Sequence, residues 1–246
     1  GPGLGQSDWA AAIYERLAAA NHLAVWDADA LNWLADAPRS TSPTSIVHLD
    51  RDRVQALYQA DPRIQYVLVF KNFGPAAGAS IAHTHSQVIA MPVVPENVYN
   101  EVSHSHRYFE KHRQCIFCSL IDEALTFEAT IYDRESGAVR RQFSVGQYVI
   151  ERGRHFVAIK PFASRYEWEL HILPLEHQAD FLQVTKEQLE DFALVLKRSM
   201  QRLDHVIGGA QYNFFLHSKP HGRDYDNCEE SYHWHLEICP RTSIPT

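Results

Sequence analysis

The sequence predicts an α+β fold made of two similar repeats, with antiparallel sheets flanked by helices. Short apolar, β-branched runs alternate with longer stretches of helical periodicity. In addition, the order helix, strand, loop and His-x-His motif occurs twice, over residues 49–87 and 185–238. The first copy has less chain before its helix than the second. We therefore expect an abbreviated N-terminal unit (residues 1–100) and a longer C-terminal unit (residues 101–246).

The composition is that of a globular protein. The chain has 246 residues, of which 45% are apolar and 22% charged, enough for a substantial core. The net charge is −7 and no long basic run occurs, which argues against a nucleic-acid polymer as a partner. We find no apolar run of membrane-spanning length and no signal-peptide pattern, so we expect a cytoplasmic protein without a membrane partner. Gly1 and Pro2 are typical of a cleaved purification tag.

The N-terminal unit is expected to begin with helices. Residues 8–36 have apolar side chains near helical spacing, in two stretches, and residues 49–59 predict a shorter amphipathic helix. The apolar, β-branched run over residues 64–70 then predicts a strand. We expect the first helices to serve only for packing, because they carry no residues that indicate a chemical role.

The stretch after this strand contains the main candidate site. Four residues define its loop: Gly74, Pro75, Gly78 and Ser80. His83 and His85 are two residues apart, which places both imidazoles on one face of a strand, and Gln87 continues that face. Loop N–H groups, a hydroxyl, two imidazoles and an amide could together hold a phosphate beside a nitrogen nucleophile. The alternative is that His-x-His forms the polar face of an ordinary strand.

The C-terminal unit is expected to combine several strands with helices. Helices are predicted over residues 98–112, 121–127 and 185–203. Strands are predicted over residues 130–132, 143–151, 156–160, 168–174, 212–217 and 232–238. Thr185 is an N-cap residue followed three residues later by Gln188, which is the pattern of a capping box.

Cys115 and Cys118 have the spacing of a zinc knuckle. Two thiolates alone are insufficient, because a structural Zn²⁺ requires four ligands. The alternative is a pair of free or redox-active thiols, although no thioredoxin-like βαβ pattern surrounds them. Cys228 and Cys239 lack ligand spacing, and we assign them no role.

At these positions the chain resembles the galactose-1-phosphate uridylyltransferase branch of the histidine-triad superfamily, over residues 45–241. Six residues at the family's spacing carry the resemblance: Asn72, Gly78, Ser80, His83, His85 and Gln87. The similarity returns in the last predicted strand, over residues 233–241. Many relatives have proline between the two histidines, where this chain has Thr84. The resemblance implies two histidine-triad-like repeats, in agreement with the internal repeat.

The resemblance also implies a set of site residues. His85 would form a covalent nucleotidyl intermediate, with His83 and Gln87 as its catalytic neighbours. The phosphates would be contacted by Asn72, Gly78, Ala79, Ser80 and Gln87. A structural Zn²⁺ would be held by Cys115, Cys118, His177 and His233. Members of the family usually pair their subunits, so a homodimer is expected.

The predicted function is nucleotidyl transfer between a nucleotide sugar and a sugar 1-phosphate. Two alternatives stay open. Phosphate or water could be the second acceptor, which would make the protein a phosphorylase or hydrolase of nucleotide sugars or dinucleoside polyphosphates. The protein could also bind nucleotides without catalysis, because the short first repeat has no place for the family's metal-binding cysteine pair or its base-binding residues.

Overall fold

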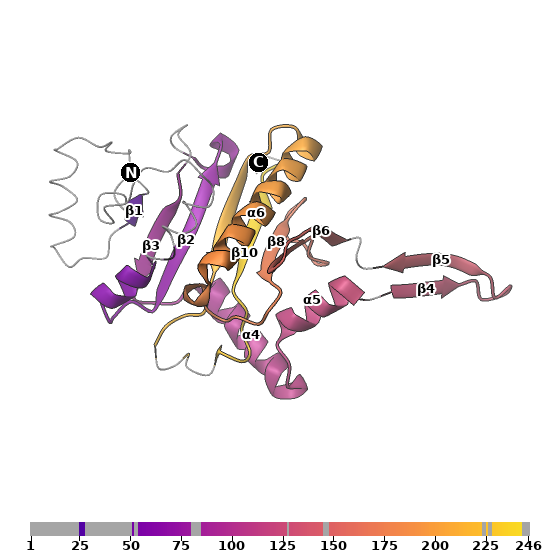
Figure 1. The fold of residues 1–246 in the computed structure, drawn as a ribbon, viewed down its shortest axis with the longest axis horizontal. Helices are drawn as coiled ribbons and strands as arrows, with labels where there is room; N and C mark the ends of the chain where they lie inside the picture. Colours follow the sequence, from indigo (N-terminus) through magenta and orange to yellow (C-terminus); the bar gives the residue numbers. More distant parts are fainter. Residues whose placement is uncertain are drawn as a thin grey trace.

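The computed structural model describes residues 25–27, 51, 54–79, 85–126, 128–144, 148–222, 225 and 228–242. Its centre is an eight-stranded sheet in the order β1-β3-β2-β9-β10-β8-β7-β6 (Figure 1). The strands are β1 Val25–Asp27, β3 Gln87–Met91, β2 Tyr66–Phe73, β9 Tyr212–His217, β10 His235–Pro240, β8 Leu170–Pro174, β7 Phe156–Ile159 and β6 Val149–Arg152. Every pairing in this sheet is antiparallel, which together with the flanking helices confirms the predicted α+β class.

The two repeats meet in the middle of this sheet, between β2 and β9. Along one row, Gln87 lies beside Phe70 and Glu237 lies beside Phe215. Phe70 and Phe215 in turn lie beside each other. Residues paired in this way point to the same face of a sheet. The Gln of the first motif and the Glu of the second therefore occupy equivalent positions on either side of the β2–β9 boundary, as an internal repeat requires.

One face of the sheet is covered by α6 (Lys186–Ile207) and by helical residues 54–60. Thr185 and Gln188 form the predicted capping box, which stabilises the start of α6 by about 1 kcal/mol. Trp234 is fully buried at the centre of this core. Its indole contacts the rings of Phe156, Phe181 and Phe192.

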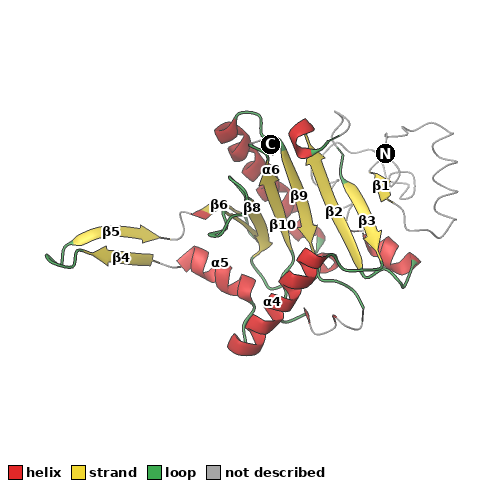
Figure 2. Ribbon diagram, turned by 180° about the vertical axis from the view of Figure 1, so that it is seen from behind, coloured by secondary structure: helices red, strands yellow, loops and turns green. Residues whose placement is uncertain are grey.

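Part of the opposite face is covered by α4 (Glu96–His112) and α5 (Ile116–Thr126) (Figures 1 and 2). Side chains of both helices join one apolar cluster with the sheet: Val98, Val102, Phe117 and Ile121. On β2 this cluster ends at Leu68, and Phe70 and Asn72 farther along the same face are half-buried. The part of this face beyond the helices carries the first motif.

The strands β4 (Glu128–Tyr132) and β5 (Val139–Ser144) form a separate hairpin that projects from the main sheet (Figures 1 and 2). Gly137 lies in its turn with a φ of 69°. The prediction of one strand over residues 143–151 is wrong, because that range is divided between β5 and β6. β5 pairs with β4, whereas β6 joins the main sheet. The apolar pattern does not show where the pairing partner changes.

Three other predicted boundaries are corrected. The helical prediction for residues 8–36 is wrong at residues 25–27, which pair with β3 as β1, and the rest of that stretch lies outside the described residues. Val25 and Trp26 are residue types that favour strands. Helix α5 begins five residues earlier than predicted, so Cys118 lies in its first turn. Strand β10 begins at His235, which leaves His233 in the preceding loop.

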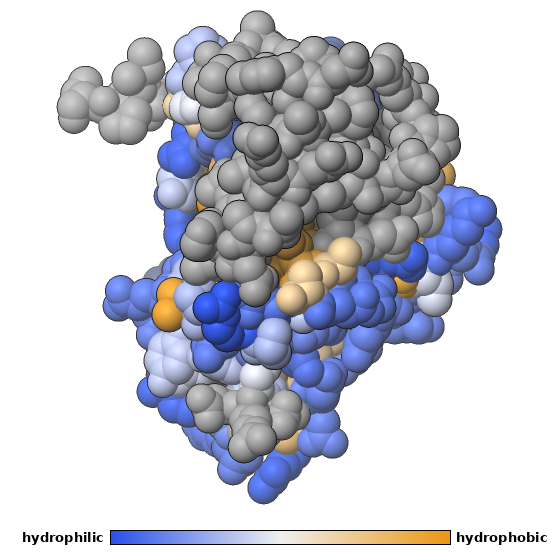
Figure 3. Space-filling model, turned by 90° about the vertical axis from the view of Figure 1, so that its left-hand side faces the viewer, coloured by the Kyte–Doolittle hydropathy of each residue, from blue (hydrophilic) through white to orange (hydrophobic). Residues whose placement is uncertain are grey.

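Figure 3 shows one side of the molecule, and grey atoms cover much of it. Seen from the β1–β3 end of the sheet, the described surface is largely hydrophilic, and the visible apolar areas are small (Figure 3). Among the described residues, no helix combines the length and the apolarity that are needed to cross a bilayer.

Candidate active site and metal centre

His85 lies just before β3, and Gln87 is the first residue of that strand. The Nε2 atom of Gln87 lies 3.1 Å from Nε2 of His85. With the Gln87 amide in this orientation its NH₂ group donates, so His85 Nε2 is the acceptor and the ring proton lies on Nδ1. In this tautomer Nε2 has the lone pair that a nucleophile needs. The other two predicted members of this group, His83 and Ser80, lie outside the described residues.

The loop between β2 and the motif contains a short 3₁₀ turn, Pro75–Ala77, between two glycines. Gly74 has a φ of 86° and Gly78 a φ of 80°, values that side chains rarely allow. A Cβ on Gly74 would also lie 2.5 Å from Cγ of Gln211. Gln211 Oε1 accepts a hydrogen bond of 2.6 Å from the N–H of Ala76. The glycines therefore permit a tight turn that packs against the second repeat.

The N–H groups of this loop already have acceptors. Those of Ala77 and Ala79 bond to the carbonyl of Gly74, and that of Gly78 bonds to the carbonyl of Pro75. A phosphate bound by Gly78 or Ala79 would have to share these N–H groups. The substrate contacts of Gly78 and Ala79 therefore stay a prediction. Side chains around the loop are the other groups that could donate hydrogen bonds to a phosphate.

The second repeat orients the end of β2. Asn213, which is buried on β9, donates from Nδ2 to Asn72 Oδ1 at 2.7 Å and to the carbonyl of Ala77 at 2.8 Å. Arg241 Nε donates to Asn213 Oδ1 at 2.6 Å. Asn213, Arg241 and Gln211 were missed from the sequence, because only the pairing of β2 with β9 brings them to the loop. Knowledge of that pairing would have been needed to find them.

The four predicted metal ligands come together from three segments. Cys115 and Cys118 lie at the start of α5, His177 follows β8, and His233 precedes β10. Their ligand atoms lie within 4.8 Å of one another. Cys118 Sγ is 3.3 Å from His177 Nδ1 and 3.6 Å from His233 Nδ1. Two thiols and two imidazoles form a donor set that suits a tetrahedral metal ion.

Backbone carbonyls orient both imidazoles of this cluster. His177 Nε2 donates to the carbonyl of Glu229 at 2.7 Å, and His233 Nε2 donates to the carbonyl of Pro174 at 3.0 Å. With the protons on Nε2, both rings direct the Nδ1 lone pair toward the thiols, which is the usual outer-shell arrangement of a metal site. Cys118 and the two imidazoles beside it outweigh burial and lower the pKa of the Cys115 thiol. These residues fit a metal ion.

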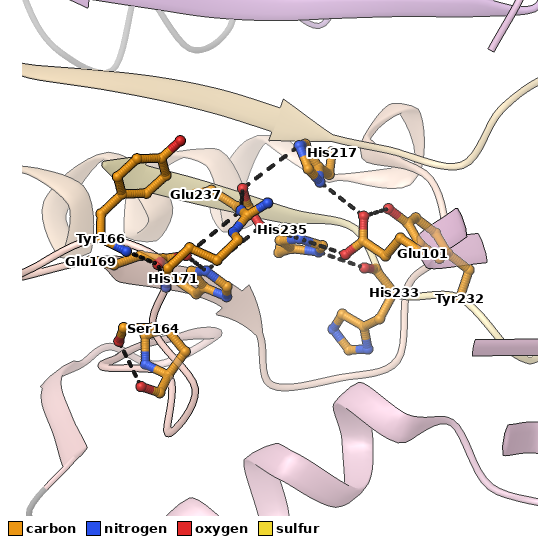
Figure 4. A network of polar contacts seen from close by, with 12 residues as sticks. Glu101, Ser164, Tyr166, Glu169, His171, His217, Tyr232, His233, His235 and Glu237 are labelled. Carbon is orange, nitrogen blue, oxygen red and sulfur yellow. Dashed lines mark hydrogen bonds and ion pairs between the residues drawn. The ribbon is translucent and has the colours of Figure 1, made fainter. Parts of the chain in front are cut away.

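The second motif lies in a buried polar network (Figure 4). His235 is fully buried, and its Nδ1 donates to the carbonyl of His233 at 3.0 Å. Its Nε2 lies 3.1 Å from Glu101 Oε1 and 3.8 Å from Glu237 Oε1, as an ion pair that is not aligned as a hydrogen bond. Glu101 also accepts a hydrogen bond of 2.9 Å from His217 Nδ1. Two carboxylates thus enclose the imidazole that corresponds to His85.

The charges in this network are fixed by their neighbours. Burial would lower the pKa of His235, but Glu101 and Glu237 outweigh it and raise the pKa to about 10. Burial would raise the pKa of Glu237, but His235 and the surrounding imidazoles outweigh it and lower the pKa to about 2. The pKa of Glu101 is also held well below its usual value, because His235 and His217 outweigh burial. These carboxylates favour the protonated form of His235 over the form with a free lone pair on Nε2.

The network continues onto β8 and the loop before it. Arg165 forms an ion pair with Glu237, and His171 Nε2 lies 2.8 Å from Glu169 Oε1. Glu169 is buried, so these partners compensate its charge. The role of Glu101 was missed from the sequence, because it reaches the motif from α4 and has no neighbour in the chain that signals such a role.

Comparisons with known proteins agree with this fold. A family model described as a domain of unknown function, DUF4921, matches residues 19–118. An ADP-glucose phosphorylase of Arabidopsis thaliana is 30% identical over 193 residues, which are 78% of this chain and 48% of that protein. A galactose-1-phosphate uridylyltransferase of Thermotoga maritima is 27% identical over 196 residues, 79% of this chain and 54% of that protein. The chain spans about half the length of these curated relatives.

Solved structures show the same similarity. The crystal structure of an ADP-glucose phosphorylase from Arabidopsis thaliana with bound ADP-glucose matches with a TM-score of 0.69 and 27% identity, over 87% of this chain and 60% of that one. The paired motifs on one antiparallel sheet define a protein of the histidine-triad class. Within that class, the chain is similar to galactose-1-phosphate uridylyltransferases and to an ADP-glucose phosphorylase over most of its length, which confirms the resemblance found in the sequence.

Proposed function

We propose that this chain is a nucleotidyltransferase that acts through a covalent nucleotidyl-His85 intermediate. His85 Nε2 attacks the α-phosphorus of a nucleotide sugar, the bond from that phosphorus to the bridging oxygen breaks, and the sugar 1-phosphate leaves. A second phosphate acceptor then attacks the same phosphorus, and the histidine leaves with its lone pair restored. Each displacement inverts the configuration at phosphorus, so the overall reaction retains it.

The contact between Gln87 and His85 is the observation that carries this proposal. It makes Nε2 the unprotonated nitrogen of the ring. When Nε2 bonds to phosphorus, the Gln87 amide loses its acceptor and becomes free to donate to a phosphoryl oxygen. A donor placed where negative charge develops is a common source of catalysis. The names of the two curated relatives, an ADP-glucose phosphorylase and a galactose-1-phosphate uridylyltransferase, support a nucleotide sugar as the substrate.

Phosphorolysis is the second candidate reaction, and the Arabidopsis thaliana relative favours it. With ADP-glucose as the substrate, glucose 1-phosphate would leave first and AMP would remain on His85. Inorganic phosphate would then attack the phosphorus and release ADP. The first displacement is the same in both reactions, so only the second acceptor separates a transferase from a phosphorylase.

We also propose that Cys115, Cys118, His177 and His233 hold a structural Zn²⁺. All four ligands come from the protein, so no position would be left for a catalytic water. The ion would join the start of α5 to the segments beside β8 and β10. In this scheme residues 1–100 supply the reacting histidine and residues 101–246 the metal centre. The homodimer implied by the family is tested by light scattering in solution.

The covalent intermediate can be detected by intact-protein mass spectrometry. The chain is mixed with ADP-glucose or UDP-glucose, and the mass increase reports whether AMP or UMP is captured. Glucose 1-phosphate, galactose 1-phosphate, inorganic phosphate or water alone is then offered, and loss of the label identifies the acceptor. We expect capture of one nucleotide per chain and its release to one of these acceptors.

Two variants make this experiment decisive. His85→Ala should capture no nucleotide while it keeps the wild-type circular dichroism spectrum. His104→Ala, which removes an exposed histidine from α4, should be labelled like the wild type. Labelling of a folded His85→Ala protein would exclude the mechanism. Reversible binding of a nucleotide sugar by the wild type, without capture, would instead identify a non-catalytic binding protein.

A further inference from the structure

The side-chain amide of Asn72 can present either its oxygen or its NH₂ group to a ligand, and the structure determines which. Asn213 lies between one group that can only accept a hydrogen bond and one that can only donate. The carbonyl of Ala77 can only accept, and it receives Asn213 Nδ2 at 2.8 Å. The Nε–H of Arg241 can only donate, and it reaches Asn213 Oδ1 at 2.6 Å. The amide of Asn213 is therefore oriented unambiguously.

The orientation of Asn213 passes to Asn72. The NH₂ group of Asn213 also lies 2.7 Å from the Asn72 side chain, so Asn72 must offer its oxygen there. Its own NH₂ group then points away from Asn213, and among the described residues it has no hydrogen-bond partner. Asn72 is half-buried on the sheet face that carries Gln87, two residues along β2 from the strand partner of Gln87.

We propose that Asn213 and Arg241 of the second repeat are positioning residues that set the polarity of the phosphate site in the first repeat. Through them, Asn72 presents N–H donors and no oxygen to the substrate. A donor attracts a phosphoryl oxygen, whereas an amide oxygen at the same place would repel it. This inference rests on the proposed function, because it takes the phosphates of a nucleotide sugar as the group that Asn72 contacts.

The surroundings of Asn213 favour a fixed orientation. Asn213 is only 5% exposed, so water does not compete for its hydrogen bonds. The guanidinium of Arg241 lies 4.7 Å from the ring centroid of Tyr166, a cation–π contact that holds the side chain beside Asn213. Arg241, Asn213 and Asn72 thus form a chain of three side chains from the end of β10, across β9, to β2.

The substitution Asn213→Asp reverses this polarity with almost no change in shape. The new carboxylate still accepts from Arg241 but cannot donate to Asn72 or Ala77. The Asn72 amide is then expected to turn, donate its NH₂ group to the carboxylate and present its oxygen to the substrate. Loss of one donor to a charged group predicts a rise of about ten- to a hundredfold in the ADP-glucose or UDP-glucose concentration that half-saturates labelling of His85. The maximal labelling rate should change less.

A double-mutant cycle separates positioning from general damage. In the Asn72→Ala background, Asn213→Asp should add less than about twofold, because the residue through which it acts is gone. Arg241→Met, at a half-buried position, removes the donor to Asn213 together with the contact to Tyr166, and it should give a smaller loss than Asn213→Asp. Gln201→Glu, the same chemical change at an exposed position of α6, should label like the wild type. Thermal unfolding of each variant verifies that it is folded.

The outcomes separate this inference from the proposed function. If the wild type captures no nucleotide from ADP-glucose or UDP-glucose, the proposed function fails. If the wild type is labelled and Asn213→Asp half-saturates at the same concentration, the polarity inference alone is wrong. It is also wrong if the losses from Asn72→Ala and Asn213→Asp multiply. If Asn213→Asp does not fold, an unchanged half-saturation in Arg241→Met is the result that overturns it.

Discussion

The two motifs of this protein occupy equivalent places in one sheet and have opposite properties. His85 is half-buried, and an amide NH₂ group of Gln87 lies 3.1 Å from its Nε2. His235 is fully buried, and the carboxylates of Glu101 and Glu237 face its Nε2. A donor beside Nε2 leaves a lone pair, whereas carboxylates favour an N–H and a positive charge. The surroundings of the first ring leave a lone pair on Nε2, whereas those of the second favour its protonated form.

Part of this difference lies at one position of the motif, and the rest comes from Glu101 on α4. Gln87 and Glu237 correspond to each other by their register with Phe70 and Phe215. Their side chains have nearly the same shape, but one donates to the preceding imidazole and the other attracts its proton. The second repeat therefore has a buried ion-pair network where the first has the contact between Gln87 and His85. The four-ligand cluster adjoins this network through His233.

The largest effect is expected from loss of a metal ligand in the second repeat. Cys118→Ala would leave three of four ligands, and structural Zn²⁺ can contribute about 10 kcal/mol to the folding of a small metal domain. We expect loss of bound zinc and a fall of several kcal/mol in the free energy of unfolding. Elemental analysis and denaturant unfolding measure both. Cys228→Ala removes a thiol outside the cluster and should keep the zinc. One zinc per chain in Cys118→Ala would refute the ligand assignment.

The next largest effect is expected from Glu101→Gln, which leaves the cation of His235 with one carboxylate. Removal of one partner from a buried ion pair typically costs about 3–5 kcal/mol. Thermal and denaturant unfolding should show this loss. Glu110→Gln, on an exposed part of the same helix, makes the same chemical change and should alter stability by less than about 0.5 kcal/mol. Equal stabilities of the two variants would mean that Glu101 does not support the second motif.

The sequence was most informative where the chemistry is local. The spacing of His85 and Gln87, and that of Cys115 and Cys118, lies within a few residues, whereas His177 and His233 were assigned only by the family resemblance. The capping box at Thr185 was predicted for the same reason, because a cap acts over only three residues.

The sequence was least informative where distant segments meet. Asn213 and Glu101 act on residues more than a hundred positions away, and neither has a local pattern that marks it. The division of residues 143–151 between two sheets also depends on pairing partners, which periodicity does not encode. Residues 25–27 became a strand because β3 offered an edge, although their surroundings have helical spacing.

A single substitution can give the first motif the carboxylate that the second motif has at the equivalent position. Gln87→Glu places a carboxylate against His85 Nε2, which favours the protonated ring and removes the lone pair. The rate of nucleotide capture at pH 7 should fall about ten- to a hundredfold, and it should recover as the pH is raised and the ring loses its proton. Gln142→Glu, on exposed β5, serves as the control. An unchanged rate without a new pH dependence would show that the neighbour of Nε2 does not decide the role of the histidine.

The smallest effect is expected in acid, and it tests the charges of the second motif. The pKa of Glu237 is about 2 in the folded state, against 4.5 for an ordinary glutamate. Between these values the unfolded chain binds more protons than the folded chain at this position, so stability falls as the pH drops from about 4.5 toward 2. Glu237→Gln removes this contribution, and its unfolding free energy should depend less steeply on pH in this window. The wild type and Glu237→Gln share the acid sensitivity of the metal ligands. This shared contribution therefore cancels in the difference between their slopes. Identical slopes would mean that Glu237 is not ionised against His235 and Arg165, and the contrast between a reactive and a structural histidine would lose its electrostatic basis.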